Sequence, residues 1–257
     1  MRFKRSQWSI PYLIFLIVFA VLPLLLVAVY AFQDDAGNFT FTNITRIFRD
    51  GTAVNTLAYS IEVAVENTVI CLLLGYPAAW ILADKKYNRS MVTVMLFILP
   101  MWINALMRTL ATAELFSVLG ITPGKGTLLF GLAYDYLPFM IYPIYNVLSK
   151  LDNSYSDAAS DLGATPWQVF WKITVPLSKS GITSGIMMVF MPTVSTFAIS
   201  EFLTNNKVKL FGTIIQENIN SSMWNYGAAL SLIMLIIIGI TSLFSDSDSN
   251  KGREAAL

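Results

Sequence analysis

Acidic side chains stand inside apolar stretches of this sequence, where charge is seldom found. They are Glu62, Glu66, Asp135 and Glu201, each within or at the edge of a long apolar run. A charged residue at the centre of a membrane helix costs about 2.5–3.5 kcal/mol on insertion scales, and such residues usually face a cavity. Carboxylates in this setting are suited to holding a positively charged ligand through ion pairs.

Aromatic rings accompany these carboxylates. Glu62 and Glu66 are four residues apart and share one helical face with Tyr59, while Tyr134 adjoins Asp135. An organic ammonium group binds carboxylates by charge and also binds ring faces within about 6 Å. We therefore predict a path for an organic cation. Its lining residues are Glu62, Glu66, Tyr59, Trp102, Asp135, Tyr134 and Glu201.

A purely structural interpretation of the same residues stays open at this point. Arg108 is the only balancing charge expected at the level of the carboxylates, so Asp135 or Glu201 could form a structural ion pair with it. Glu62 lies about one turn inside the membrane, where water could solvate it. The rings could serve packing alone.

Composition excludes several classes of chemistry. The chain has 257 residues and no histidine, which removes histidine catalysis, histidine metal ligands and the Ser/His/Asp triad. Its single cysteine, Cys71, excludes an intrachain disulfide and a cysteine-built zinc site. We expect no catalytic residue and no metal site. The net charge of +1 gives no footprint for nucleic acid.

The elements that must position the carboxylates are membrane helices. Hydrophobic residues make up 55% and charged residues 13%, against about 45–50% and about 25% in soluble domains. A span needs about 20 apolar residues. The sequence predicts an all-α membrane protein with six spans, at Ile10–Phe32, Thr56–Ala83, Met91–Leu110, Thr127–Leu148, Ile182–Phe202 and Ala228–Phe244.

The expected organisation follows from these spans. We predict a retained N-terminal anchor helix at 1–32, an external loop at 33–55, a core of five spans at 56–244 and a tail at 245–257. Most of the 17 lysines and arginines fall in segments on the side of the N-terminus. The positive-inside rule then predicts a multi-pass protein of the cell (inner or plasma) membrane, in contact with lipid, with both termini cytoplasmic.

The longest cytoplasmic segment, 149–181, carries helix signals and is too polar to span. Asn153–Gly163 reads as a short helix that ends at Gly163 in the left-handed region. Thr165 then caps a second helix and Gln168 completes a capping box. Pro176 marks a place where this helix ends or bends.

This loop resembles a known family motif. Asp157-Ala158-Ala159-x3-Gly163, followed by Ile173-x-Val175-Pro176, resembles the Glu-Ala-Ala-x3-Gly-x9-Ile-x-Leu-Pro loop of inner-membrane permease subunits of ABC importers. Asp157 replaces the usual Glu and Val175 the usual Leu. The resemblance implies the MetI-like fold of type I importer permeases. It also implies a coupling helix that docks on an ATPase, with Asp157, Ala158, Ala159, Asp161, Gly163 and Pro176 as its residues.

The nucleotide is expected on a different chain. No G-x-x-x-x-G-K-[ST] sequence occurs here, because Gly124-Lys125-Gly126 lacks both the frame and the Ser/Thr. We therefore expect no cofactor on this chain, with ATP and Mg bound by the partner ATPase. The chain itself is expected to be a transport subunit and not an enzyme.

A second resemblance concerns the run from Pro192 to Leu203, with Gly212 and Gln216 after it. It looks like the B-type permease subunit of spermidine/putrescine importers, in which an acidic residue matches Glu201. This implies polyamine import, a C-type permease as heterodimer partner, two copies of an ATPase and an external or periplasmic polyamine-binding protein. Asn205-Asn206-Lys207 departs from the expected glycines and leaves the preferred polyamine open.

Other functions remain as alternatives to polyamine import. A permease for a thiamine-like cation, a quaternary ammonium compound or ferric iron would use the same carboxylates. A secondary transporter would work without an ATPase, which the loop motif argues against. An intramembrane enzyme would need a nucleophile and base at catalytic spacing, and the sequence shows none.

Overall fold

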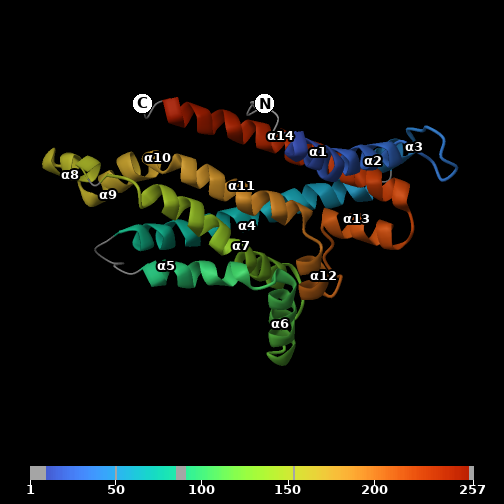
Figure 1. Ribbon diagram of the computed structural model, residues 1–257. Coiled ribbons are helices and arrows are strands. Elements are labelled where there is room, and N and C mark those ends of the chain that lie inside the picture. The colour runs from blue at the N-terminus through green and yellow to red at the C-terminus, as the bar shows by residue number, and fades with distance from the viewer. Residues whose placement is uncertain (1–9, 50, 85–90, 153, 255–257) are drawn as a thin grey trace. The chain divides into compact units, whose positions relative to one another are not determined.

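The structure is a computed structural model that describes residues 10–49, 51–84, 91–152 and 154–254. Within these ranges the chain is helical almost throughout, and the extended pairing is limited to an isolated bridge between Gln33 and Phe39 (Figure 1). An apolar chain favours this solution, because a helix satisfies its own backbone hydrogen bonds inside a bilayer.

The elements follow in chain order and keep the labels of Figure 1. The first half comprises α1 (Ile10–Leu16), the π-helical η2 (Ile17–Val21), α2 (Leu22–Ala31), α3 (Thr42–Arg49), α4 (Thr52–Ala83), α5 (Met91–Ile98), the 3-10 turn η3 (Leu99–Trp102), α6 (Ala105–Val118) and α7 (Lys125–Leu148). The second half comprises α8 (Ser154–Asp161), α9 (Pro166–Val169), the π-helical η4 (Phe170–Thr174), α10 (Val175–Leu177), α11 (Lys179–Ser195), α12 (Ala198–Thr204), α13 (Phe211–Asn220) and α14 (Trp224–Glu254).

The chain divides into two compact units, which are described one at a time. The first comprises Met1–Thr56 with Ile214–Ile237, and the second comprises Leu57–Thr213 with Ile238–Leu257. Every residue of the predicted substrate path and of the predicted coupling helix belongs to the second unit.

In the first unit, the predicted anchor helix is present from Ile10 to Ala31 as α1, η2 and α2, and residues 1–9 lie outside the described ranges. Its large apolar side chains, such as Phe19 at 68% exposure, point outward on all sides, as in a helix surrounded by lipid. The π-helical turn ends at Val21, two residues before Pro23, and the backbone N–H of Leu22 donates to the carbonyl of Ile17. This wider turn accommodates a proline ring that would collide with an α-helical carbonyl.

The predicted number of spans matches the helices by length and composition. Long apolar helices cover Pro11–Ala31, Thr52–Ala83, Lys125–Leu148 and Trp224–Ser242. Two bent pairs supply the remainder if each counts as one span. They are Val92–Trp102 with Ala105–Val118, bent by 87°, and Pro166–Leu177 with Lys179–Ser195, bent by 65°.

Two predicted spans are wrong as continuous helices. The span Met91–Leu110 breaks at Ile103, because Pro100 sits in a 3-10 turn and the Asn104 side chain caps α6 by accepting from the backbone N–H groups of Leu106 and Met107. The span Ile182–Phe202 breaks at Thr196, whose backbone is extended between α11 and α12. Figure 1 shows α6 turned away from α5.

Two predicted connecting segments also contain helix. The external loop 33–55 holds α3 and the first turn of α4, and Arg46 of α3 lies over the ring of Tyr226 at 4.4 Å. The tail 245–257 continues α14 as far as Glu254, and residues 255–257 lie outside the described ranges.

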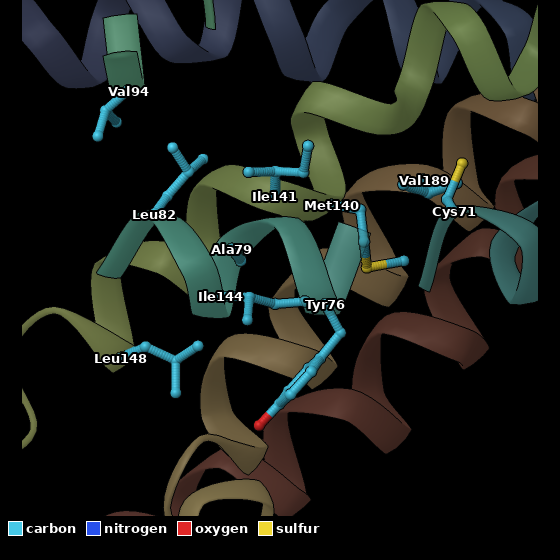
Figure 2. Close-up of a cluster of buried hydrophobic side chains, with 10 residues drawn as sticks. All are labelled: Cys71, Tyr76, Ala79, Leu82, Val94, Met140, Ile141, Ile144, Leu148 and Val189. Atoms are coloured by element: carbon cyan, nitrogen blue, oxygen red, sulfur yellow. The ribbon is translucent and has the colours of Figure 1, made fainter. Parts of the chain in front are cut away.

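The core of the second unit forms where α4, α5, α7 and α11 meet. Figure 2 shows its buried side chains, which are Cys71, Tyr76, Ala79, Leu82, Val94, Met140, Ile141, Ile144, Leu148 and Val189. Gly181 and Gly185 let α11 approach α7, since a Cβ on Gly185 would lie 2.7 Å from the sulfur of Met140. Small residues at such contacts are the usual means of close packing between membrane helices.

A second apolar cluster packs α12 against α4 and α7. Its buried members are Val63, Leu128, Leu132, Ile199, Leu203 and Leu210. The hydroxyl of Thr127, near the start of α7, donates to the carbonyl of Leu203 at 2.9 Å. This cluster packs the N-terminal half of α7, which carries Asp135, against α4 and α12.

Candidate functional site

Among the described residues of the second unit, the most deeply buried charges form an ion pair between α6 and α7. The Nη2 atom of Arg108 lies 3.1 Å from Oδ1 of Asp135, and the two residues are 7% and 2% exposed. The hydroxyl of Thr109, one residue along α6, donates to Oδ2 of Asp135 at 3.1 Å. The interpretation in which Arg108 pairs with Asp135 is confirmed in this structure.

This ion pair borders a cavity of about 400 Å³. The walls include Trp102, Arg108, Asp135, Tyr136, Phe139 and Ile199. The bend after Trp102 makes the cavity possible, because it sets α6 across α7 instead of continuing along it. Two predicted path residues, Trp102 and Asp135, therefore meet at one site, where a carboxylate lies among aromatic rings.

Tyr134 takes a different position. It does not line the cavity, and its ring lies 5.5 Å from the guanidinium carbon of Arg108. Arg108 itself was expected only as a counter-charge, although it is the sole basic residue within its predicted span. A lone charge of that kind was the signal that could have marked it as a site residue. Tyr136 and Phe139 complete the aromatic wall.

Glu62 and Glu66 form a separate cluster around Lys125. The ammonium nitrogen of Lys125 lies 2.9 Å from Oε1 of Glu62 and 2.8 Å from Oε1 of Glu66, and 5.7 Å from the centre of the Tyr59 ring. The expectation that Arg108 is the only balancing charge is therefore wrong. Lys125 opens α7, and that position brings its flexible side chain to the face of α4 that carries both carboxylates.

Glu201 stands apart from both sites. It lies half-buried on α12, and its neighbour Ile199 reaches the cavity wall while Glu201 does not. Asn205 and Asn206 follow with φ angles of 50° and 61°. Asn tolerates this left-handed region better than most side chains, so the departure from glycine preserves the turn. Gly212 approaches closely, since its Cβ would lie 2.3 Å from the carbonyl oxygen of Ser195.

The predicted coupling loop has the expected local structure. Helix α8 covers Ser154–Asp161, and Gly163 follows with a φ of 84°, while Asn153 lies outside the described ranges. The Thr165 hydroxyl accepts from the backbone N–H of Gln168, whose side chain accepts in turn from the N–H of Thr165. The predicted capping box is confirmed.

The predicted coupling residues present an open surface. Asp157, Ala158 and Asp161 are exposed, Ala159 is half-buried, and nothing lies within 4 Å of a Cβ built on Gly163. Two large apolar side chains extend this surface, with Leu162 at 89% exposure and Trp167 at 70%. Exposed apolar groups rimmed by charge are typical of a protein–protein contact.

The predicted coupling loop contacts α4 through aromatic rings, and the sequence did not predict this contact. The ring of Phe170 packs edge-on against Tyr76 at 5.6 Å and Trp80 at 5.8 Å. The Tyr76 hydroxyl also lies 2.9 Å from the hydroxyl of Ser178, at the 65° bend that follows Pro176. The loop therefore contacts α4 directly, both through Phe170 and at the start of α11 through Ser178.

Comparison with known proteins gives the class first. The family described as "Binding-protein-dependent transport system inner membrane component" matches residues 2–247. Together with the apolar helices and the coupling loop, this defines a membrane permease. The chain belongs to this family of inner membrane transport components.

Individual relatives narrow the comparison. The chain is 33% identical over 252 residues to the spermidine/putrescine transport system permease protein PotB of Escherichia coli (strain K12), covering 89% of this chain and 91% of that protein. It is 32% identical to the protein of the same name from Haemophilus influenzae, covering 88% and 87%.

Solved structures agree on the fold. A bacterial ABC transporter involved in the import of the acidic polysaccharide alginate has a chain with a TM-score of 0.69, 14% identity and coverage of 96% of this chain and 94% of its own. The MetNI methionine ABC transporter matches with a TM-score of 0.61, 14% identity and coverage of 77% and 95%. The MetI-like permease fold predicted from the loop motif is confirmed.

Proposed function

We propose that this chain is the permease subunit of an ABC importer for polyamines of the spermidine and putrescine class. Relatives that share about a third of their residues over nine-tenths of the chain are named for these substrates, which supports the assignment. The observation that supports a cationic substrate is the position of Asp135, a carboxylate that is 2% exposed and lines a cavity with aromatic walls.

The chemistry of the cavity suits an alkyl ammonium. Asp135 offers charge, while Trp102 and Tyr136 offer ring faces and Ile199 offers apolar contact for methylene groups. A volume of about 400 Å³ falls within the usual range for small-ligand sites, about 300–1,000 Å³. Glu62, Glu66, Tyr59 and Glu201 would guide the cation elsewhere along the path.

The partners in this proposal follow from the family. Two copies of a cytoplasmic ATPase bind ATP and Mg, a C-type permease forms the heterodimer, and an external polyamine-binding protein delivers substrate. Both termini lie in the cytoplasm, and this chain has no catalytic residue of its own. Closure of the ATPases is transmitted through Asp157–Gly163 to α4 and α11.

Substrate competition tests the assignment directly. The complex of this chain with its partners is reconstituted in vesicles, and uptake of labelled spermidine is measured against excess putrescine, thiamine, choline or ferric iron. Competition by putrescine alone supports the proposal. Stronger competition by thiamine, choline or iron assigns the path to that cation instead.

The coupling role has its own test in Gly163→Pro. A φ of 84° lies far from the value of about −65° that proline imposes, so the turn after α8 cannot form. Co-purification of the ATPase should be lost while membrane insertion is unchanged. Gly120→Pro, at another left-handed glycine, is the matched control and should retain the ATPase. Undiminished ATPase binding by Gly163→Pro would contradict the docking role.

A further inference from the structure

The ion pair between Arg108 and Asp135 is incompletely satisfied for two charges so deeply buried. A guanidinium carries five N–H donors. Among the described residues, Nε and Nη1 of Arg108 have no hydrogen-bond partner, although both atoms are buried. Oδ1 of Asp135 likewise accepts no hydrogen bond of good geometry, and only the 3.1 Å approach of Nη2 compensates it.

This geometry differs from that of a permanent structural pair. Arginine and carboxylate frequently meet through two parallel hydrogen bonds, which fix the geometry and satisfy both oxygens. Here one nitrogen faces one oxygen, and the other oxygen is bonded to Thr109. A partly satisfied buried network is costly to keep, so this one is poised to exchange its partner.

The cavity would place an ammonium group of the substrate beside the Arg108–Asp135 ion pair. Both Arg108 and Asp135 line it, and so do the rings of Trp102 and Tyr136. An ammonium group that enters this space lies next to Asp135, whose buried Oδ1 is compensated only by Nη2 of Arg108. The guanidinium already lies over the ring of Tyr134, 5.5 Å from its central carbon, and this contact does not depend on Asp135.

We propose that Arg108 is a tethered counter-ion that neutralises Asp135 in the empty permease and is displaced from Oδ1 by an ammonium group of the substrate. This rests on the proposed function, in which Asp135 contacts a cationic substrate. Arg108 therefore competes with the substrate and sets both its affinity and the minimum charge it must carry. A neutral molecule of the same shape cannot release Arg108, because it leaves Asp135 without a counter-charge.

Uptake kinetics in reconstituted vesicles test this competition. Asp135→Asn should raise the KM for spermidine, because it removes the charge that the ammonium binds. Arg108→Gln should lower the KM by about tenfold, the size of one lost competing contact. The double variant should remain as weak as Asp135→Asn. Arg46→Gln is the matched arginine control, because it does not line the cavity, and should leave the KM unchanged.

Added guanidinium ion separates competition from structural repair. Millimolar guanidinium should raise the KM of Arg108→Gln back towards the wild-type value, since the free ion occupies Asp135. If Arg108 were only structural, guanidinium would improve uptake by this variant, and the double variant would recover wild-type uptake. Either result overturns the proposal.

Assembly controls keep the test decisive. A misfolded variant lowers the maximal rate, whereas loss of a competitor changes the KM. If Arg108→Gln does not assemble with its partners, Arg108→Lys keeps the charge without the planar guanidinium. A KM below wild type for that variant supports the proposal, and an equal or higher KM contradicts it. A wild-type KM for Asp135→Asn contradicts the proposed substrate path itself. A raised KM for Asp135→Asn together with an unchanged KM for Arg108→Gln contradicts only the counter-ion role of Arg108.

Discussion

In the part of the second unit that the structure describes, Lys125 and Arg108 each face carboxylates, and their two sites differ mainly in exposure. At Lys125 the charges meet at 2.8 and 2.9 Å, and the side chains of Lys125, Glu62 and Glu66 are 38%, 55% and 37% exposed. At Arg108 the contact is longer, 3.1 Å, and the side chains are 6% and 3% exposed. The shorter contacts therefore belong to the more exposed site.

This difference decides which site depends on its charges. Water and salt screen an exposed ion pair, so its net contribution to stability is about 0–1 kcal/mol despite good distances. Removal of one partner from a buried pair leaves a charge with no compensation and costs about 3–5 kcal/mol. The Arg108–Asp135 pair thus matters more to the permease than its single contact suggests.

Asp135→Asn is expected to have the largest effect on stability. Arg108 would keep its charge while 7% exposed and would lose the carboxylate that neutralises it. The free energy of unfolding should fall by about 3–5 kcal/mol, seen as a lower melting temperature of the purified complex. The double variant with Arg108→Gln should recover most of this loss without recovering uptake. A melting temperature unchanged by Asp135→Asn would show that the two sites do not differ in this way.

Lys125→Gln is expected to have a smaller effect. The lost ion pairs are partly exposed, so stability should fall by about 0–1 kcal/mol. The difference between wild type and variant should shrink further as salt is raised, because exposed charges are screened over about 10 Å at 0.1 M. Melting temperatures at low and high salt check this. A loss as large as that of Asp135→Asn would remove the contrast.

Asp152 extends the comparison to a carboxylate outside the spans, where the effect is smallest. The backbone N–H of Ser154 donates to its Oδ1 at 3.0 Å, and this hydrogen bond lowers the pKa of Asp152 below the ordinary 3.8. Any stability from this contact is present above the ordinary pKa and is lost as the pH falls through the lowered value. Ser154→Pro removes the donor at a helix start that tolerates proline. A carboxyl titration followed by NMR should then show the pKa of Asp152 rising, and no rise would contradict this cause.

The features that sequence predicted well depend on neighbours within a few residues. The left-handed turn at Gly163 and the capping box of Thr165 and Gln168 follow from local backbone chemistry, and both are confirmed. The bend near Pro176 has the same origin. Apolar length likewise predicted where membrane helices lie, because a span must match the bilayer.

The features that the sequence did not predict depend on contacts between distant segments. The break after Trp102 lies inside an apolar run, so hydropathy read Met91–Leu110 as one span. Lys125 looked like a residue of an external loop, and only the packing of α7 against α4 brings it between Glu62 and Glu66. Phe170 contacts Tyr76 and Trp80, which lie about ninety positions earlier in the sequence, and no sequence motif predicts this contact.

By itself the sequence determined that this protein is a helical permease and where its cytoplasmic-loop motif turns, because apolar length and short-range turn chemistry act along the chain. Only the tertiary structure decided which carboxylates are buried and which cation each one faces. The identity of the ion partners depends on the crossing of α6, α7 and α4, and burial changes the energetic weight of a charge more than its distance from a partner does.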